Sequence, residues 1–253
     1  MGKCKDAQKI FIGISENLLK NKKLSEDSLM GRPDKVPTPT HTQRVVTKDT
    51  AKIQQIFKPP KKIKKKMKSF KSNAWILPQP VLIIGTYDKD GRPNAMNAAW
   101  GGQWDMHEIM ISLGSHQTTD NLDQNPEFTV TFATADTLVA ADYVGIASGR
   151  KTPDKMAKTG WTIEKAPNVN APLFRDFPMT LECRVKQKLD ESETGYYLIA
   201  EIVNILCDER YLAEDGKPDV EAMDLITYDP VHHNYIKLGN VEGKAFADGK
   251  QIG

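Results

Sequence analysis

Apolar and polar residues alternate regularly from Trp75 onward, and this pattern predicts β-strands. Residues 80–87, PVLIIGTY, are rich in strand-forming side chains, and DKDG at 88–91 supplies turn residues. Residues 92–100, RPNAMNAAW, can return beside the first run, so the two runs predict a hairpin. Two further strands are expected, at 108–115 and 128–134.

Two helices are expected around these strands. In residues 116–127, HQTTDNLDQNPE, the side chain of Thr118 or Asp120 can cap a short helix that ends before Pro126. Residues 136–148 have helical spacing, and one side of this helix would carry Leu138, Ala141 and Val144.

A second hairpin is expected closer to the C-terminus. Residues 178–189 alternate over much of their length, whereas 195–207 are more continuously apolar, as a strand covered on both faces would be. The separator DESETG has turn chemistry. Many strands, short loops and few helices predict a mainly β fold, built as a closed or nearly closed antiparallel β-barrel.

Charge separates the first 66 residues from the rest. They hold 17 Lys and Arg against 6 Asp and Glu, a balance of +11, while the remainder carries −9. Most of this segment is rich in proline, threonine and lysine and is expected to be mobile, with one short amphipathic helix formed by Ile10, Phe11, Ile14 and Leu18. We therefore expect a basic extension, 1–66, and a domain, 67–253. Met67 stands at this boundary, so the extension can also be an upstream addition to a protein whose translation once began at Met67.

The extension has two possible roles. A basic segment can neutralise nucleic acid phosphates or anionic lipid, although a solvated tail is the plainer interpretation.

Three cysteines without C-x-x-C spacing favour a reducing compartment over a disulfide framework or a thiolate metal site. No apolar run approaches the roughly 20 residues of a membrane span. We expect a cytoplasmic protein without a membrane partner.

Several catalytic motifs fail on spacing. The glycines of GIASGRKT are too close together for a P-loop, and no G-x-G-x-x-G follows a strand, so any nicotinamide cofactor would bind transiently. Ser115 beside His116 lacks the glycines of a nucleophile elbow. His232 and His233 would point to opposite faces of a strand, and we predict no metal site there.

Small residues interrupt the strand pattern in NAMNAAWGGQW, residues 94–104. They leave main-chain N–H and C=O groups uncovered, which suits a flat heteroaromatic ligand, but close packing against another element explains them equally well. The residues concerned are Ala95, Ala98, Ala99, Gly101 and Gly102.

Alcohol side chains gather at the end of the strand that follows. Hydroxyls and free N–H groups before a helix suit a phosphate, although a plain helix cap is commoner. Together with the small residues, this cluster favours a phosphorylated cofactor; it comprises Ser112, Ser115, Thr118 and Thr119.

The sequence resembles the flavin reductase-like proteins, which include flavoredoxin. The resemblance runs from about Trp75 to Phe246 and rests on seven segments in the same order: DGRPNAMNAAW, ISLGSHQTTDNL, NPEFTV, AADYVGIASGRKTPDK, NAPLF, LECRV and YIKLGNVEGKAF. It implies a Greek-key split barrel that binds FMN, with the flavin at the interface of a homodimer.

The resemblance also implies the cofactor site. The flavin ring would lie along Asn97, Ala98, Ala99 and Trp100, with Asn94 and Met96 supporting the turn. The ribityl chain and phosphate would be held by Ser112, Ser115, His116 and Thr118. Near the flavin edge and the dimer partner would lie Ser148, Gly149, Arg150 and Lys155.

Two residues depart from the family pattern. His116 stands where arginine is common, which would weaken phosphate binding when the imidazole is neutral. Thr131 replaces a frequent asparagine.

The implied activity is that of an FMN-dependent oxidoreductase. FMN would take hydride from NADH or NADPH and pass electrons to a small-molecule or protein acceptor, so no protein acid, base or nucleophile is required. Arg150 and Lys155 would supply positive charge, or else be solvated cations. Two alternatives are a flavoredoxin-like electron carrier that does not oxidise NAD(P)H and a nucleic-acid-binding barrel with a basic arm and no flavin.

Overall fold

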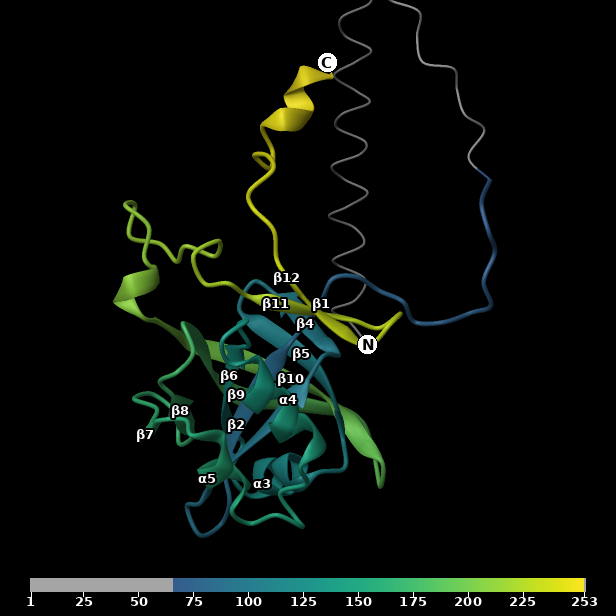
Figure 1. Cartoon of the computed structure of the whole chain (residues 1–253). Coiled ribbons are helices and arrows are strands. Elements are labelled where there is room, and N and C mark those ends of the chain that lie inside the picture. The colour runs from purple at the N-terminus through teal and green to yellow at the C-terminus, as the bar shows by residue number, and fades with distance from the viewer. Residues whose placement is uncertain (1–65, 253) are drawn as a thin grey trace, which may run out of the picture. The chain divides into compact units, whose positions relative to one another are not determined.

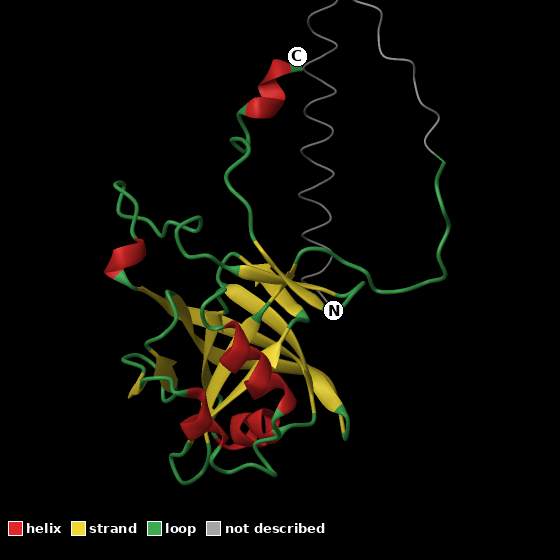
Figure 2. Cartoon of the chain, viewed as in Figure 1, coloured by secondary structure: helices red, strands yellow, loops and turns green. Residues whose placement is uncertain are grey.

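The computed structural model of the protein describes residues 66–252, and one compact unit begins at Ser69. The expected basic extension, with its short helix, lies outside the described residues except for Lys66. From residue 66 onward the chain is mainly β, as predicted, with three α-helices packed against one side of a curled sheet (Figures 1 and 2).

The main sheet has seven strands in the order β3-β2-β6-β9-β10-β5-β4, and every neighbouring pair is antiparallel. Both predicted hairpins are confirmed, as β2–β3 and β9–β10. The strands are β2 (Leu82–Tyr87), β3 (Pro93–Ala98), β4 (Gly101–Asp105), β5 (Glu108–Gly114), β6 (Glu127–Phe132), β9 (Met179–Ser192) and β10 (Gly195–Cys207).

Two smaller sheets lie beside the main one. Their strands are only two to four residues long, so they show too few alternations to be predicted. The first has the order β1 (Gln79–Pro80), β11 (Ile226–Asp229) and β12 (Asn234–Lys237), and the second pairs β7 (Ile163–Lys165) with β8 (Pro172–Phe174).

Both predicted helices are present, as α3 (Gln117–Gln124) and α4 (Leu138–Ile146), and a third, α5 (Lys155–Thr159), was not predicted. On α4, the expected face is buried at Ala141 and Val144 and partly buried at Leu138. Short 3₁₀ turns, η1 and η2, cover Glu209–Tyr211 and Asp248–Gln251.

A short corner closes the barrel. The strands β3 and β4 are consecutive in the chain but lie at opposite edges of the sheet, joined only by Ala99 and Trp100. The carbonyl of Trp100 accepts a hydrogen bond from the Ser112 N–H at 2.8 Å. A Cβ on Gly101 would lie 3.1 Å from both Leu82 Cδ1 and the Met110 carbonyl oxygen. The sheet must therefore curl, and Gly101 has little room for a side chain beside this corner, whereas Trp100 is mostly exposed.

This crowding decides between the two explanations of the small residues. Ala95 is fully buried beneath α4, Ala98 belongs to the barrel core, and Gly101 is packed as described above, so an uncovered shelf is wrong for these three. Of the two glycines in this segment, Gly102 is the one with open space at its Cβ position. Close packing of the strand is the main reason for the pattern.

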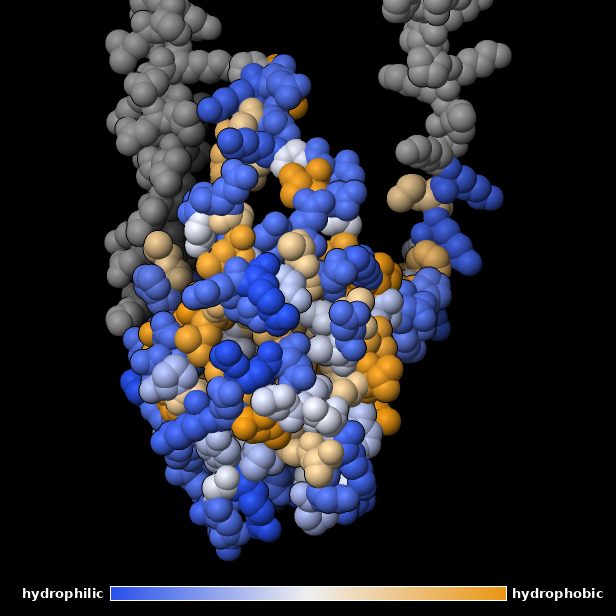
Figure 3. Space-filling view, turned by 60° about the vertical axis from the view of Figure 1, so that its left-hand side comes forward, coloured by the Kyte–Doolittle hydropathy of each residue, from blue (hydrophilic) through white to orange (hydrophobic). Residues whose placement is uncertain are grey.

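The core has two principal parts. One fills the barrel and includes Phe128, Val130 and Leu198; the other lies between β2, β3 and the helices and includes Ile83 and Phe174. Figure 3 shows a mainly polar face with separate apolar spots, as expected for the outside of such a core.

Two buried polar side chains, Thr131 and Glu182, are paired within the barrel wall. The hydroxyl of Thr131 donates to the Met179 carbonyl at 2.6 Å, so this departure from the family pattern serves contact between strands. The fully buried Glu182 accepts hydrogen bonds from the Asn168 N–H, the Asn168 amide and the Asn204 amide. These bonds hold the loop before β8 against the sheet.

Candidate functional site

Three adjoining hollows form a trough beside β3, the start of α3 and the end of α4. The central hollow, of about 220 Å³, brings together eight of the fourteen residues predicted for the cofactor. These are Asn94, Met96, Asn97, His116, Thr118, Ser148, Gly149 and Lys155. Residues from four separate parts of the sequence thus line one space.

The two asparagines of β3 are tied to the neighbouring helices. Asn94 Nδ2 donates to Thr118 Oγ1 at 3.0 Å, and the Thr118 side chain is almost fully buried. Asn97 Nδ2 donates to the Ala141 carbonyl of α4 at 3.1 Å. The amides are therefore held in place by protein contacts before any ligand is bound.

The start of α3 differs from the prediction. The N-cap residue is His116, not Thr118 or Asp120, and its N–H donates to Thr119 Oγ1 at 3.0 Å. Thr118 instead lies inside the helix and accepts from Asn94, which is a tertiary contact that no local pattern reveals. The first N–H groups of a helix have no partner within it, and Gln117 and Thr118 of this first turn line the central hollow.

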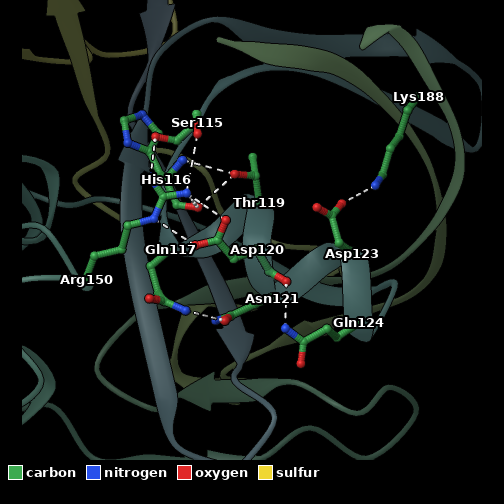
Figure 4. Close-up of polar contacts among 10 residues, drawn as sticks. All are labelled: Ser115, His116, Gln117, Thr119, Asp120, Asn121, Asp123, Gln124, Arg150 and Lys188. Carbon is green, nitrogen blue, oxygen red and sulfur yellow. Dashed lines mark hydrogen bonds and ion pairs between the residues drawn. The ribbon is translucent and has the colours of Figure 1, made fainter. Parts of the chain in front are cut away.

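Arg150 ties the loop after α4 to this helix start, as Figure 4 shows. Its guanidinium forms two hydrogen bonds with the Asp120 carboxylate, at 2.6 and 2.7 Å, and reaches Ser115 Oγ and the His116 carbonyl at 3.3 Å. Hydrogen bonding to Arg150 lowers the pKa of Asp120. Arg150 is thus paired with Asp120 although 43% of its side chain is exposed, and it brings a guanidinium next to His116.

Lys155, unlike Arg150, is not solvated, since only 4% of its surface is exposed. Its Nζ donates to the carbonyls of Val144 and Ala147, at 3.3 and 2.9 Å, at the C-terminal end of α4. Burial lowers the pKa of Lys155 to about 8. No carboxylate within residues 66–252 forms an ion pair with it, so the trough contains a buried cation that lacks an anion.

Two glycines allow the loop and helix to approach β3. A Cβ on Gly145 would lie 3.0 Å from Asn97 Cβ, and one on Gly149 would lie 2.6 Å from Asn94 Oδ1 and 3.0 Å from Gln117 Cβ. Larger residues at these positions would push α4 and its following loop away from the strand. The width of the trough therefore depends on both glycines.

The outer hollows differ in chemistry. The first, of about 510 Å³, is the basic end: it contains Lys89, Arg92, Arg150 and Lys155 against Asp88 and Asp120. The second, of about 240 Å³, is the aromatic end: its wall consists of Asn97, Ala99, Asp142, Gly145, Ile146, Tyr228 and Tyr235. A ligand that is anionic at one end and aromatic at the other matches this polarity.

Four of the fourteen predicted residues line none of these hollows. The Ala98 side chain packs in the barrel core, whereas Trp100 is mostly exposed. Ser112 lies on β5 beside the corner, and Ser115 contacts Arg150. These residues support the site's framework from outside the trough.

Sequence reasoning missed several lining residues, notably Gln117, Asp142, Gly145, Tyr228 and Tyr235. Gln117, Asp142, Gly145 and Tyr235 lay in quoted segments, where they had no assigned role, and Tyr228 lay in none. Tyr228 and Tyr235 come from the hairpin β11–β12, whose shortness hid it.

The adjacent histidines have separate partners: His232 Nδ1 lies 3.0 Å from Asp229 Oδ2, and His233 Nδ1 lies 2.5 Å from the Tyr228 hydroxyl oxygen. Among the described residues, no group of three or more His, Cys, Asp or Glu side chains is arranged to hold a metal ion. No helix between residues 66 and 252 is long and apolar enough to cross a membrane.

An antiparallel split barrel with a polar-to-aromatic trough defines the structural class, and sequence comparison identifies the family. Residues 74–222 match the flavin reductase like domain family. The chain belongs to this family of flavin-binding oxidoreductases. No curated protein matches the chain.

Solved structures support the same assignment. Flavoredoxin of Desulfovibrio vulgaris (Miyazaki F) is 33% identical, with a TM-score of 0.68 over 73% of this chain and 100% of that one. Flavoredoxin from Methanosarcina acetivorans is 27% identical, with a TM-score of 0.67 over 74% and 100%. A split barrel protein from Shewanella frigidimarina NCIMB 400, 18% identical, has the same fold, with a TM-score of 0.58 over 67% and 86%.

The glycine contacts yield a test of how the trough is built. We expect Gly149→Ala to lower the free energy of unfolding by about 1–3 kcal/mol, because the added methyl group meets Asn94 and Gln117. The matched control, Gly102→Ala, meets nothing within 4 Å and should change stability by less than about 0.5 kcal/mol. Urea unfolding monitored by fluorescence measures both. Equal effects of the two substitutions would contradict the proposed packing.

Proposed function

We propose that the protein binds FMN in the trough and works as an NAD(P)H-dependent oxidoreductase. The observation that carries this proposal is the buried cation Lys155, which has no carboxylate partner among residues 66–252 and lies between a basic and an aromatic end. Membership of a flavin-binding family supports the same ligand.

The size of the trough suits FMN only when its parts are combined. The hollows of about 220 and 240 Å³ are each smaller than the roughly 300 Å³ at which ligand pockets usually begin. They share Asn97, Gly145 and Ile146 as wall residues, and we infer that FMN would extend across both hollows. The residues present therefore fit a long amphiphilic cofactor.

Each end of the trough would hold a different part of FMN. The phosphate and ribityl chain would bind at the N-terminus of α3, where free N–H groups, Thr118 and His116 meet Ser148 and Lys155. The ring would lie toward Asn97 and Ala99 at the aromatic end, with Asn94 and Met96 lining the central hollow beside it.

FMN bound there would supply two-electron chemistry, taking hydride from NADH or NADPH and delivering electrons to an acceptor. The chain's own residues would bind FMN, orient it and offset its negative charge. Lys155 stabilises negative charge in the central hollow, and Arg150 fixes the loop that carries His116. Asn97 is held by α4, so its amide presents a fixed dipole.

An electron carrier is the second candidate. It is favoured by the similarity to two flavoredoxins at 33% and 27% identity. The third candidate, nucleic acid binding through the basic arm, concerns residues outside the described part of the chain.

Titration of purified full-length protein with FMN tests the proposal. We expect saturable binding with quenching of flavin fluorescence, and bleaching of the bound flavin by NADH or NADPH under anaerobic conditions. Failure to bind FMN even at millimolar concentration would refute the site. Binding followed by bleaching only in the presence of a separate reductase would favour the carrier. Testing both nicotinamides also determines which one the protein prefers.

The shifted pKa of Lys155 predicts how FMN affinity depends on pH. Because this pKa is lowered to about 8, the free protein loses the Lys155 charge as pH rises above that value, and FMN affinity should fall about tenfold between pH 7 and 9.5. Lys155→Met should bind more weakly at pH 7 and lose most of this dependence. The control Lys158→Met, on the exposed side of the same helix, should retain it. An unchanged pH profile in Lys155→Met would contradict the assigned role.

We further propose a homodimer. Large apolar side chains lie on and beside β4, an edge strand of the main sheet: Trp100, Trp104 and Met106 are 67%, 53% and 81% exposed. An apolar edge strand favours association with another chain.

Sedimentation velocity tests the dimer. We expect the wild-type protein to sediment as a dimer and Trp104→Lys to shift it toward monomer. Val220→Lys, at a similarly exposed apolar residue away from β4, should leave the dimer intact. A monomeric wild-type protein would refute the proposal.

A further inference from the structure

The aromatic end of the trough carries an unbalanced negative charge. Asp142 projects from α4 into the same hollow as Asn97 and Ala99, the residues next to which the ring would lie. No cation of the described chain forms an ion pair with Asp142. This charge is opposite in sign to that of Lys155 in the adjoining central hollow.

One hydrogen bond moderates this charge. The Tyr235 hydroxyl donates to Asp142 Oδ1 at 2.7 Å. Burial, followed by the bond to Asp142, raises the pKa of Tyr235 to about 12, so the phenol keeps its proton at neutral pH. Tyr235 therefore acts as a permanent donor that draws negative charge away from the exposed side of the carboxylate.

The neighbouring tyrosine is fixed by a different contact. The Tyr228 hydroxyl pairs with His233 Nδ1, and His233 adopts a left-handed backbone conformation with φ of 59°. The rings of Tyr228 and Tyr235 have centroids 6.1 Å apart. Both phenols are held by protein partners, so the wall around Asp142 has a fixed arrangement of dipoles.

We propose that Asp142, moderated by Tyr235, sets the reduction potential of the bound cofactor. This inference rests on the proposed binding of FMN. At neutral pH, two-electron reduction of FMN takes up two electrons and one proton, so the ring gains one negative charge. A nearby carboxylate disfavours that charge and lowers the potential, while the hydrogen bond from Tyr235 weakens this effect.

Two substitutions should shift the potential in opposite directions. Asp142→Asn removes the charge but can still accept the Tyr235 hydrogen bond, so it should raise the potential. Tyr235→Phe leaves the carboxylate without its donor and should lower it. We expect about a tenfold change in the ratio of affinities for reduced and oxidised FMN, which is about 30 mV for a two-electron couple. The control Asp136→Asn removes an exposed charge near the start of the same helix, outside the trough, and should change nothing.

The experiment is an anaerobic redox titration of each FMN-loaded full-length variant against a reference dye, together with fluorescence titration of oxidised FMN. Nearly unchanged affinity for oxidised FMN with opposite shifts in potential supports the proposal, since a merely structural role would not produce two signs. Unchanged potentials, or shifts of the same sign, would overturn it. If the wild-type protein binds no FMN at all, the proposed function fails and this inference fails with it.

Discussion

The covalent link between the two edges of one sheet is the constraint on which the rest of the structure depends. Because β3 passes into β4 through only Ala99 and Trp100, the seven strands must curl until these edges meet. Gly101 then has little room for a side chain beside the corner, and β3 is left at an edge where α3, α4 and α5 can pack against it. The trough lies along this edge, so barrel closure and ligand site have one cause.

Charge along the trough is held by hydrogen bonds to buried groups and by one exposed ion pair. Lys155 is held by the carbonyls at the end of α4, Asp142 is held by Tyr235, and Arg150 is shared between Asp120 and the helix start. Burying Lys155 without an anion costs free energy, as its lowered pKa indicates. An anionic ligand would offset that cost, which gives the protein a physical reason to favour the bound state.

The sequence predicted the long elements well, because β2, β5, β6, β9 and β10 have enough residues for their alternation to be recognised. It failed at β4, whose residues GGQWD lack alternation, and at β11 and β12, which are four residues each. Eight of the predicted site residues share one hollow, but that prediction came from family resemblance and not from spacing. The role of Thr118 and the presence of Tyr228 depend on contacts between distant segments, which no local pattern encodes.

The hairpin β11–β12 lies beyond the region matched to the family, which ends at residue 222, yet it forms the wall of the aromatic end. Its strand pairing is with β1 and not with the barrel strands. A small separate sheet outside the seven-stranded barrel therefore supplies the wall of the aromatic end. The residues matched to the family model, taken alone, would leave this wall out of the site.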